Sequence, residues 1–113
     1  MRREDKILVV EDNPAICREM EQSFDCDCAT DGWDAIEKLE TRHYDAIVID
    51  ADVPRHSGYG VLTYLREEVG DDLPNVIFLT DNDETDIRRR VGRTLKVVGK
   101  ANAVVEVTRM LDS

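Results

Sequence analysis

Three acidic residues directly follow two short apolar runs of the chain. Glu11 and Asp12 follow residues 7–10 (ILVV), and Asp50 follows residues 46–49 (AIVI). Both runs are rich in β-branched residues and lack polar alternation, which is typical of parallel strands buried on both faces. The crevice of an open α/β sheet lies at the carboxyl ends of its strands, so we expect the three carboxylates to converge there. Such acids repel one another, and a cage of oxygen ligands with room for water suits Mg²⁺, so a magnesium site is predicted.

Two further polar residues follow apolar runs later in the chain. Thr80 comes after residues 76–79 (VIFL), and Lys100 comes after residues 95–99 (LKVVG). Taken singly, a strand-end aspartate, threonine or lysine is usually a helix cap, an ordinary strand residue or a solvated charge. An acid pair, an aspartate, a hydroxyl and a lysine at successive strand ends instead favour one functional site.

Apolar runs alternate with segments of helical periodicity along the whole chain. The strands are predicted at 6–10, 26–29, 45–50, 75–80 and 95–98. The helices are predicted at 13–23, 32–43, 58–69, 83–92 and 101–111. Five strand-helix repeats predict a doubly wound α/β fold with right-handed crossovers. A length of 113 residues predicts a single domain, 1–113.

Composition excludes several classes of protein. The net charge of -10 argues against direct binding to nucleic acid or to an anionic membrane. No apolar stretch approaches the length of a membrane span, and the N-terminus lacks the core of a signal peptide. The three cysteines are Cys17, Cys26 and Cys28, and they have no repeated metal-ligand spacing. We expect reduced thiols in a cytoplasmic protein.

The chain resembles, over essentially its whole length, the receiver domain of bacterial two-component response regulators. The matching segments are 6–14 (KILVVEDNP), 29–39 (ATDGWDAIEKL), 44–58 (YDAIVIDADVPRHSG) and 76–80 (VIFLT). The spacing from Asp50 to Pro54 and Gly58 follows the pattern that the family keeps around its phosphorylated aspartate. The resemblance implies a flavodoxin-like fold, with a five-stranded parallel sheet of order 2-1-3-4-5 and five helices.

The resemblance also implies a metal site. Asp12 would bind Mg²⁺ directly, Glu11 would bind it through water, and Asp50 would complete the acidic group. The backbone carbonyl of Asp52 would be the remaining protein ligand.

The resemblance further implies the chemistry of a phosphoacceptor switch in a two-component phosphorelay. Asp50 would accept a phosphoryl group from a phosphohistidine, Thr80 would hydrogen-bond a phosphoryl oxygen, and Lys100 would pair with its charge. Positioning and electrostatics dominate phosphoryl transfer, and these residues supply both. The partners would be a sensor histidine kinase or phosphotransfer protein and a downstream effector. The protein would be an enzyme only in promoting its own phosphorylation and dephosphorylation.

Four residues depart from the family pattern. Ala101 replaces the proline after the lysine, and Val97 replaces the aromatic residue that rotates on activation. Asp81 stands where a small residue follows the switch hydroxyl, and Asp52 adds a carboxylate beside the site. Asp81 is expected to slow phosphorylation by small anionic donors through charge repulsion. These departures leave open a degenerate receiver that binds partners without phosphorylation.

A second alternative is a Toprim-type Mg²⁺ enzyme acting on nucleic acid. Glu11 together with Asp50 and Asp52 resembles its metal site, but that family follows its glutamate with glycine rather than Asp12. The charge of -10 also disfavours a polyanionic substrate.

Six basic residues crowd into a thirteen-residue stretch, namely Arg88, Arg89, Arg90, Arg93, Lys96 and Lys100. They are interpreted either as a solvated helix face or as a contact surface. Because the family dimerises through its fourth helix, fifth strand and fifth helix, a homodimer through residues 83–111 is possible. Glu106 and Asp112 could then pair with these arginines across a twofold axis.

Overall fold

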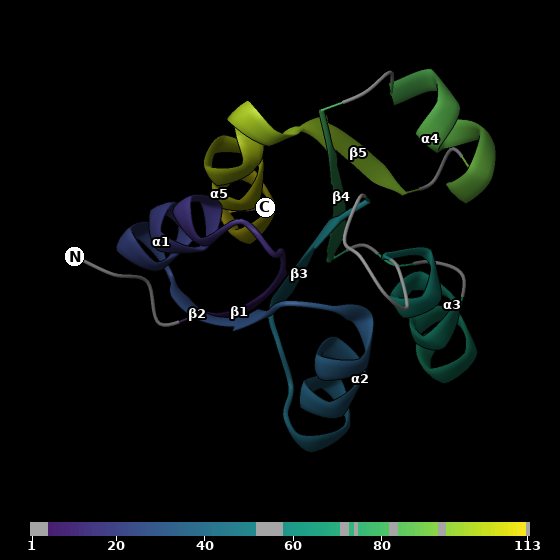
Figure 1. The fold of residues 1–113 in the computed structure, drawn as a ribbon, viewed down its shortest axis with the longest axis horizontal. Helices are drawn as coiled ribbons and strands as arrows, with labels where there is room; N and C mark the ends of the chain where they lie inside the picture. Colours follow the sequence, from purple (N-terminus) through teal and green to yellow (C-terminus); the bar gives the residue numbers. More distant parts are fainter. Residues whose placement is uncertain are drawn as a thin grey trace.

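The computed structural model describes residues 5–51, 58–70, 73, 75–81, 84–92 and 95–112. Strands and helices alternate through these residues (Figure 1). The strands are β1 (Lys6–Val10), β2 (Asp25–Ala29), β3 (Ala46–Asp50), β4 (Val76–Thr80) and β5 (Lys96–Gly99). The helices are α1 (Pro14–Ser23), α2 (Gly32–Thr41), α3 (Gly58–Val69), α4 (Glu84–Val91) and α5 (Ala103–Asp112), with a 3₁₀ turn, η1, at Lys100–Asn102.

The five strands form one parallel sheet in the order β2-β1-β3-β4-β5. This order confirms the predicted flavodoxin-like fold. The register aligns the carboxyl ends: Val10 pairs with Ile49, Asp50 with Leu79, and Thr80 with Gly99. Residues that end β1, β3, β4 and β5 therefore lie along one edge of the sheet.

Helices cover both faces of the sheet. In Figure 1, α1 and α5 lie on one side of the strands, and α2, α3 and α4 lie on the other. The side chains of β1 alternate between these two layers. Ile7 and Val9 join the cluster that contains Met20 of α1, whereas Leu8 and Val10 join the cluster that contains Val61 of α3.

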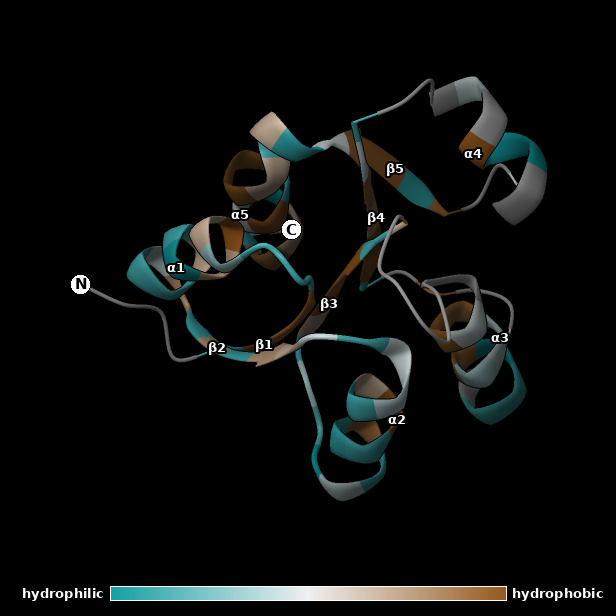
Figure 2. Cartoon of the chain, viewed as in Figure 1, coloured by the Kyte–Doolittle hydropathy of each residue, from teal (hydrophilic) through white to brown (hydrophobic). Residues whose placement is uncertain are grey.

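Much of β3 has the hydrophobic colour in Figure 2, as do β5 and parts of α3 and α5. All of β3, and all of β1 after Lys6, is buried. The absence of polar alternation in these two strands is thus explained by helices packed against both of their faces.

The observed ends of helices and strands lie within two residues of the predicted ends. Capping residues fix where two of the helices begin. α1 begins at Pro14 because Asn13 is its N-cap, with its side chain accepting the backbone N–H of Ala15 at 2.9 Å. Asp31 caps α2 in the same way through the N–H of Asp34. The last helix was predicted from residue 101, but this segment begins as the 3₁₀ turn at Lys100 and becomes α-helical only at Ala103.

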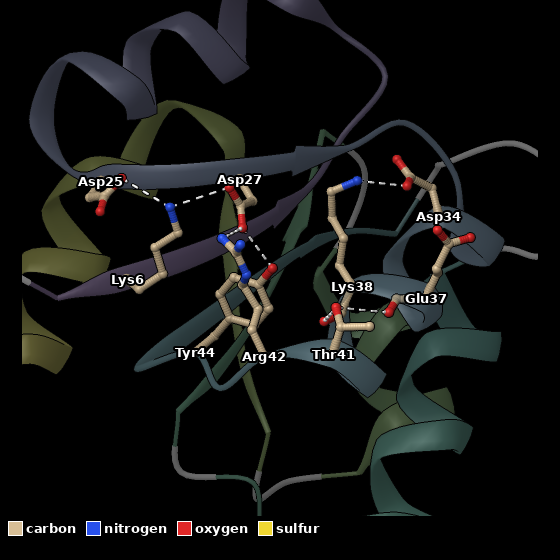
Figure 3. A network of polar contacts seen from close by, with 9 residues as sticks. All are labelled: Lys6, Asp25, Asp27, Asp34, Glu37, Lys38, Thr41, Arg42 and Tyr44. Atoms are coloured by element: carbon tan, nitrogen blue, oxygen red, sulfur yellow. Dashed lines mark hydrogen bonds and ion pairs between the residues drawn. The ribbon is translucent and has the colours of Figure 1, made fainter.

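Polar contacts join the edge strand β2 to its neighbours (Figure 3), in addition to the apolar packing of Cys26, Cys28 and Ala29. Asp27 accepts hydrogen bonds from Arg42 at 2.9 Å and from the Tyr44 hydroxyl at 2.8 Å, and it pairs with Lys6 at 3.3 Å. Lys6 also binds Asp25 at 3.0 Å. These contacts fasten β2 to β1 and to the segment after α2. Beyond them, the carbonyl of Ala29 at the end of β2 accepts the backbone N–H of Glu11 at 2.9 Å.

Candidate functional site at the carboxyl edge of the sheet

The three predicted acids lie together at the ends of β1 and β3. Carboxylate oxygens of Glu11, Asp12 and Asp50 all lie within 4.8 Å of one another. Glu11 and Asp50 are each only 1% exposed, while Asp12 faces solvent. The cluster therefore has a buried floor of two carboxylates and an open side formed by Asp12.

Glu11 is held by the turn that leads into α1. Its Oε2 accepts the backbone N–H groups of Asp12 at 3.0 Å and Asn13 at 3.2 Å. Its Oε1 is buried and has no hydrogen-bond partner among the residues that the structure describes. A buried carboxylate oxygen without a donor is what a metal ion or its bound water would satisfy. The donor set and this orphan oxygen thus fit a hard divalent cation.

The buried, acidic surroundings of Glu11 shift its pKa. Burial, together with the neighbouring Asp50 carboxylate, raises the pKa of Glu11 to about 8. The N–H group of Asn13 and the charge of Lys100 oppose this rise without cancelling it.

Lys100 brings a positive charge to the same place from the end of β5. Its Nζ lies 2.9 Å from Oδ2 of Asp50 and 3.4 Å from Oδ2 of Asp81, and its side chain is 16% exposed. Partial burial works to lower the pKa of Lys100, but the hydrogen bond to Asp50 and the nearby carboxylates raise it overall. Lys100 accordingly stays charged beside Asp50 throughout the physiological pH range.

Thr80 is the last residue of β4 and is 1% exposed. Its neighbour Leu79 pairs with Asp50 in the register of β3 and β4, so Thr80 lies at the same edge as the acid cluster. Asp52, predicted to offer a backbone carbonyl to the metal, lies outside the described residues. Four of the predicted site residues lie close to one another, namely Glu11, Asp12, Asp50 and Lys100. Thr80 lies at the same edge of the sheet.

The contact between Lys100 and Asp81 was not anticipated from the sequence, where Asp81 was expected only to repel anionic donors. The contact depends on the register of β4 against β5, which no local sequence pattern encodes. Thr80 pairs with Gly99, so the residue after each of them leaves the sheet at the same place.

Comparison with known proteins identifies the family. The model of the response regulator receiver domain matches residues 7–105. The chain belongs to this family. A receiver domain is a signalling domain of two-component response regulators rather than a classical enzyme, and this membership displaces the Toprim alternative.

The receiver domain is similar to curated response regulators in sequence. It is 35% identical over 85 residues to the transcriptional regulatory protein DltR of Streptococcus agalactiae, an alignment that covers 71% of this chain and 37% of DltR. The chain thus spans little more than a third of the length of that relative.

Solved receiver structures share the fold. The receiver domain of the sensor histidine kinase PA1611 from Pseudomonas aeruginosa is 26% identical, with a TM-score of 0.72 and coverage of 98% of this chain and 100% of that one. It has a magnesium ion coordinated in its active-site cleft. The response regulator TrrA of Thermotoga maritima, in complex with Mg²⁺ and BeF, is 25% identical, with a TM-score of 0.72 and 96% of each chain covered.

The described part of this receiver domain contains no helix that is both long and apolar enough to cross a membrane.

Proposed function

We propose that this receiver domain is a phosphoacceptor switch in which Asp50 takes a phosphoryl group from a phosphohistidine. The donor would be a sensor histidine kinase or a phosphotransfer protein. The observation that carries the proposal is the setting of Asp50, a buried carboxylate with two acidic neighbours and the ammonium group of Lys100 at 2.9 Å. Residues 1–113 would act as one receiver unit.

Glu11, Asp12 and Asp50 would hold Mg²⁺ in this proposal, and the magnesium in the similar PA1611 receiver supports that assignment. The backbone carbonyl of Asp52 would be a further ligand, at a position outside the described residues. When bound, the cation screens the negative charge of the incoming phosphoryl group and of the acid cluster.

Three side chains of this protein would have separate roles in the transfer step. An oxygen of Asp50 attacks the phosphorus atom, the P–N bond to the donor histidine breaks, and the imidazole leaves with the bonding electron pair. Lys100 neutralises charge on the phosphoryl oxygens, and the hydroxyl of Thr80 donates a hydrogen bond to one of them. Water later attacks the same phosphorus atom, the P–O bond to Asp50 breaks, and inorganic phosphate leaves as the Asp50 carboxylate is regenerated.

The output would be a changed surface for a downstream effector, and a homodimer through residues 83–111 is one form of it. Contacts within the chain already occupy part of that surface. Glu106 pairs with Lys96 at 3.5 Å and with Arg109 at 2.8 Å, and Arg88 donates to the carbonyl of Val97 at 3.4 Å. A dimer that uses Glu106 across a twofold axis therefore has to exchange these pairs. Sedimentation with and without beryllofluoride tests it, and a monomer in both states at low salt would exclude it.

Intact-mass measurement after incubation with acetyl phosphate and Mg²⁺ tests the proposed function. We expect one added phosphoryl group in the wild type, none in Asp50→Asn, and ordinary labelling in Asp112→Asn, which removes a distant acid. An unlabelled wild type, under conditions that label a known receiver, would instead support a degenerate receiver that binds partners without phosphorylation. Labelling that survives in Asp50→Asn would contradict the site assignment.

A further inference from the structure

Lys100 contacts two carboxylates that come from neighbouring strands. Its Nζ lies 2.9 Å from Asp50 at the end of β3 and 3.4 Å from Asp81, the residue after β4. The two carboxylates are therefore no farther apart than the sum of these distances. Asp50 is buried, whereas the side chain of Asp81 is 69% exposed. The ammonium group of Lys100 thus links the buried Asp50 carboxylate to the exposed Asp81 carboxylate.

A lysine shared in this way is not fully available to a third anion. An ammonium group has three donors and one positive charge, and each carboxylate that it contacts neutralises part of that charge. A phosphoryl group on Asp50 brings additional negative charge to the same place. It would have to draw Lys100 away from Asp81 or leave part of its own charge uncompensated.

We propose that Asp81 is a positioning residue that acts through Lys100 and competes with the phosphoryl group for its ammonium. This inference rests on the proposed phosphoacceptor function of Asp50. Asp81 would thereby lower the stability of the phosphorylated state relative to the unphosphorylated state. This effect is small, because the Asp81 carboxylate is largely exposed and a single exposed ion pair contributes little free energy.

The competition for Lys100 has a second consequence, which follows from the position of Asp81. Asp81 directly follows Thr80, the proposed phosphoryl hydrogen-bond donor. When the phosphoryl group binds Lys100, the side-chain contact between Asp81 and Lys100 is lost, while Thr80 stays paired with Gly99. Capture of the lysine would therefore release the residue next to the switch hydroxyl and favour movement at that end of β4.

The binding of beryllofluoride in the presence of saturating Mg²⁺ tests the inference, because this anion is the probe that mimics the phosphoryl group. Asp81→Asn keeps the shape of the side chain and removes its charge. It should bind beryllofluoride about 2-fold to 5-fold more tightly than the wild type. Asp81→Glu should stay within about 2-fold of the wild type, since a carboxylate remains within reach of Lys100. Glu40→Gln removes an exposed acid of α2 that does not belong to the acid cluster, and it should have no effect.

Combining each variant with Lys100→Met separates action through the lysine from direct repulsion by Asp81. If Asp81 acts through Lys100, the gain from Asp81→Asn should fall below about 2-fold once the lysine is gone. Direct repulsion predicts the opposite, because the gain would persist or grow without the screening ammonium. Rates of labelling by acetyl phosphate, followed by intact mass, provide the same comparison if Lys100→Met binds beryllofluoride too weakly to titrate.

The outcomes separate this inference from the proposed function. Ordinary binding to the wild type with no effect of Asp81→Asn, or a gain that survives in Lys100→Met, would overturn the inference alone. A wild type that neither binds beryllofluoride nor accepts a phosphoryl group would overturn the proposed function and the inference with it.

Discussion

Glu11 and Asp50 face each other as two buried carboxylates, each 1% exposed, at the ends of adjacent strands. Lys100 compensates Asp50 directly, but Oε1 of Glu11 lacks a hydrogen-bond donor among the described residues. The site is therefore electrostatically incomplete without a cation, and its proposed metal should act on folding as well as on phosphoryl transfer.

We expect Mg²⁺ alone to raise the thermal midpoint of unfolding, because a ligand that binds only the folded state stabilises it by mass action. At a Mg²⁺ concentration of 100 times the dissociation constant, the gain in unfolding free energy should be about 2.7 kcal/mol. Asp12→Ala should remove most of this shift. Asp112→Ala is the matched control, and an Asp12 variant that responds as strongly as this control would exclude Asp12 as a ligand.

The Asp27 network should make stability depend on pH at the acidic end. Partial burial works to raise the pKa of Asp27, but hydrogen bonds from Tyr44 and Lys6 and the charges of Lys6 and Arg42 lower it overall. A depressed folded-state pKa contributes stability above the unfolded value of about 3.9 and loses it as the pH falls through the folded value. Asp27→Asn should therefore cost roughly 1.5–3 kcal/mol at pH 7, and less below about pH 4.

Urea unfolding of the wild type and Asp27→Asn between pH 3 and pH 7 measures this difference. Asp25→Asn is the control, since Asp25 lies on the same strand and binds the same lysine but has a more exposed side chain. A constant difference between wild type and Asp27→Asn across the whole range would show that the charge of Asp27 is not what stabilises β2.

Salt should stabilise this protein. A net charge of -10 on 113 residues repels itself in the compact state, and salt screens that repulsion. The screening length falls from about 30 Å at 0.01 M to about 3 Å at 1 M. The thermal midpoint should therefore rise with NaCl at fixed pH. Replacing the exposed acids Glu19 and Glu40 by lysine should reduce the rise, and an unchanged salt dependence in that variant would point to an effect other than net charge.

Two aromatic residues should differ sharply in their contribution to stability. Phe24 is buried between α1 and the sheet, whereas Trp33 at the start of α2 is 65% exposed. Phe24→Ala should cost about 3–5 kcal/mol through lost burial and the cavity it leaves. Trp33→Ala should change the unfolding free energy by no more than about 0.5 kcal/mol. Denaturant unfolding followed by circular dichroism compares them, and a large loss in Trp33→Ala would show that its ring has a packing role.

The sequence alone predicted the fold and the place where the acid cluster forms. The runs that became β1 and β3 are apolar on both faces, and this pattern is typical of parallel strands buried between two helix layers. Parallel strands then bring Glu11, Asp50 and Thr80 to one edge, since the carboxyl ends of such strands lie at the same side of a sheet.

Tertiary structure decided the features that depend on contacts between distant residues. The strand at 26–29 was predicted, but the contacts of Asp27 with Lys6, Arg42 and Tyr44 were not, because they join separate elements. Likewise, the pairing of Lys100 with Asp81 follows from the register of β4 against β5, which no local pattern encodes. Local periodicity specifies which face of an element is buried, but the partner of a charged side chain is fixed only when separate elements pack together.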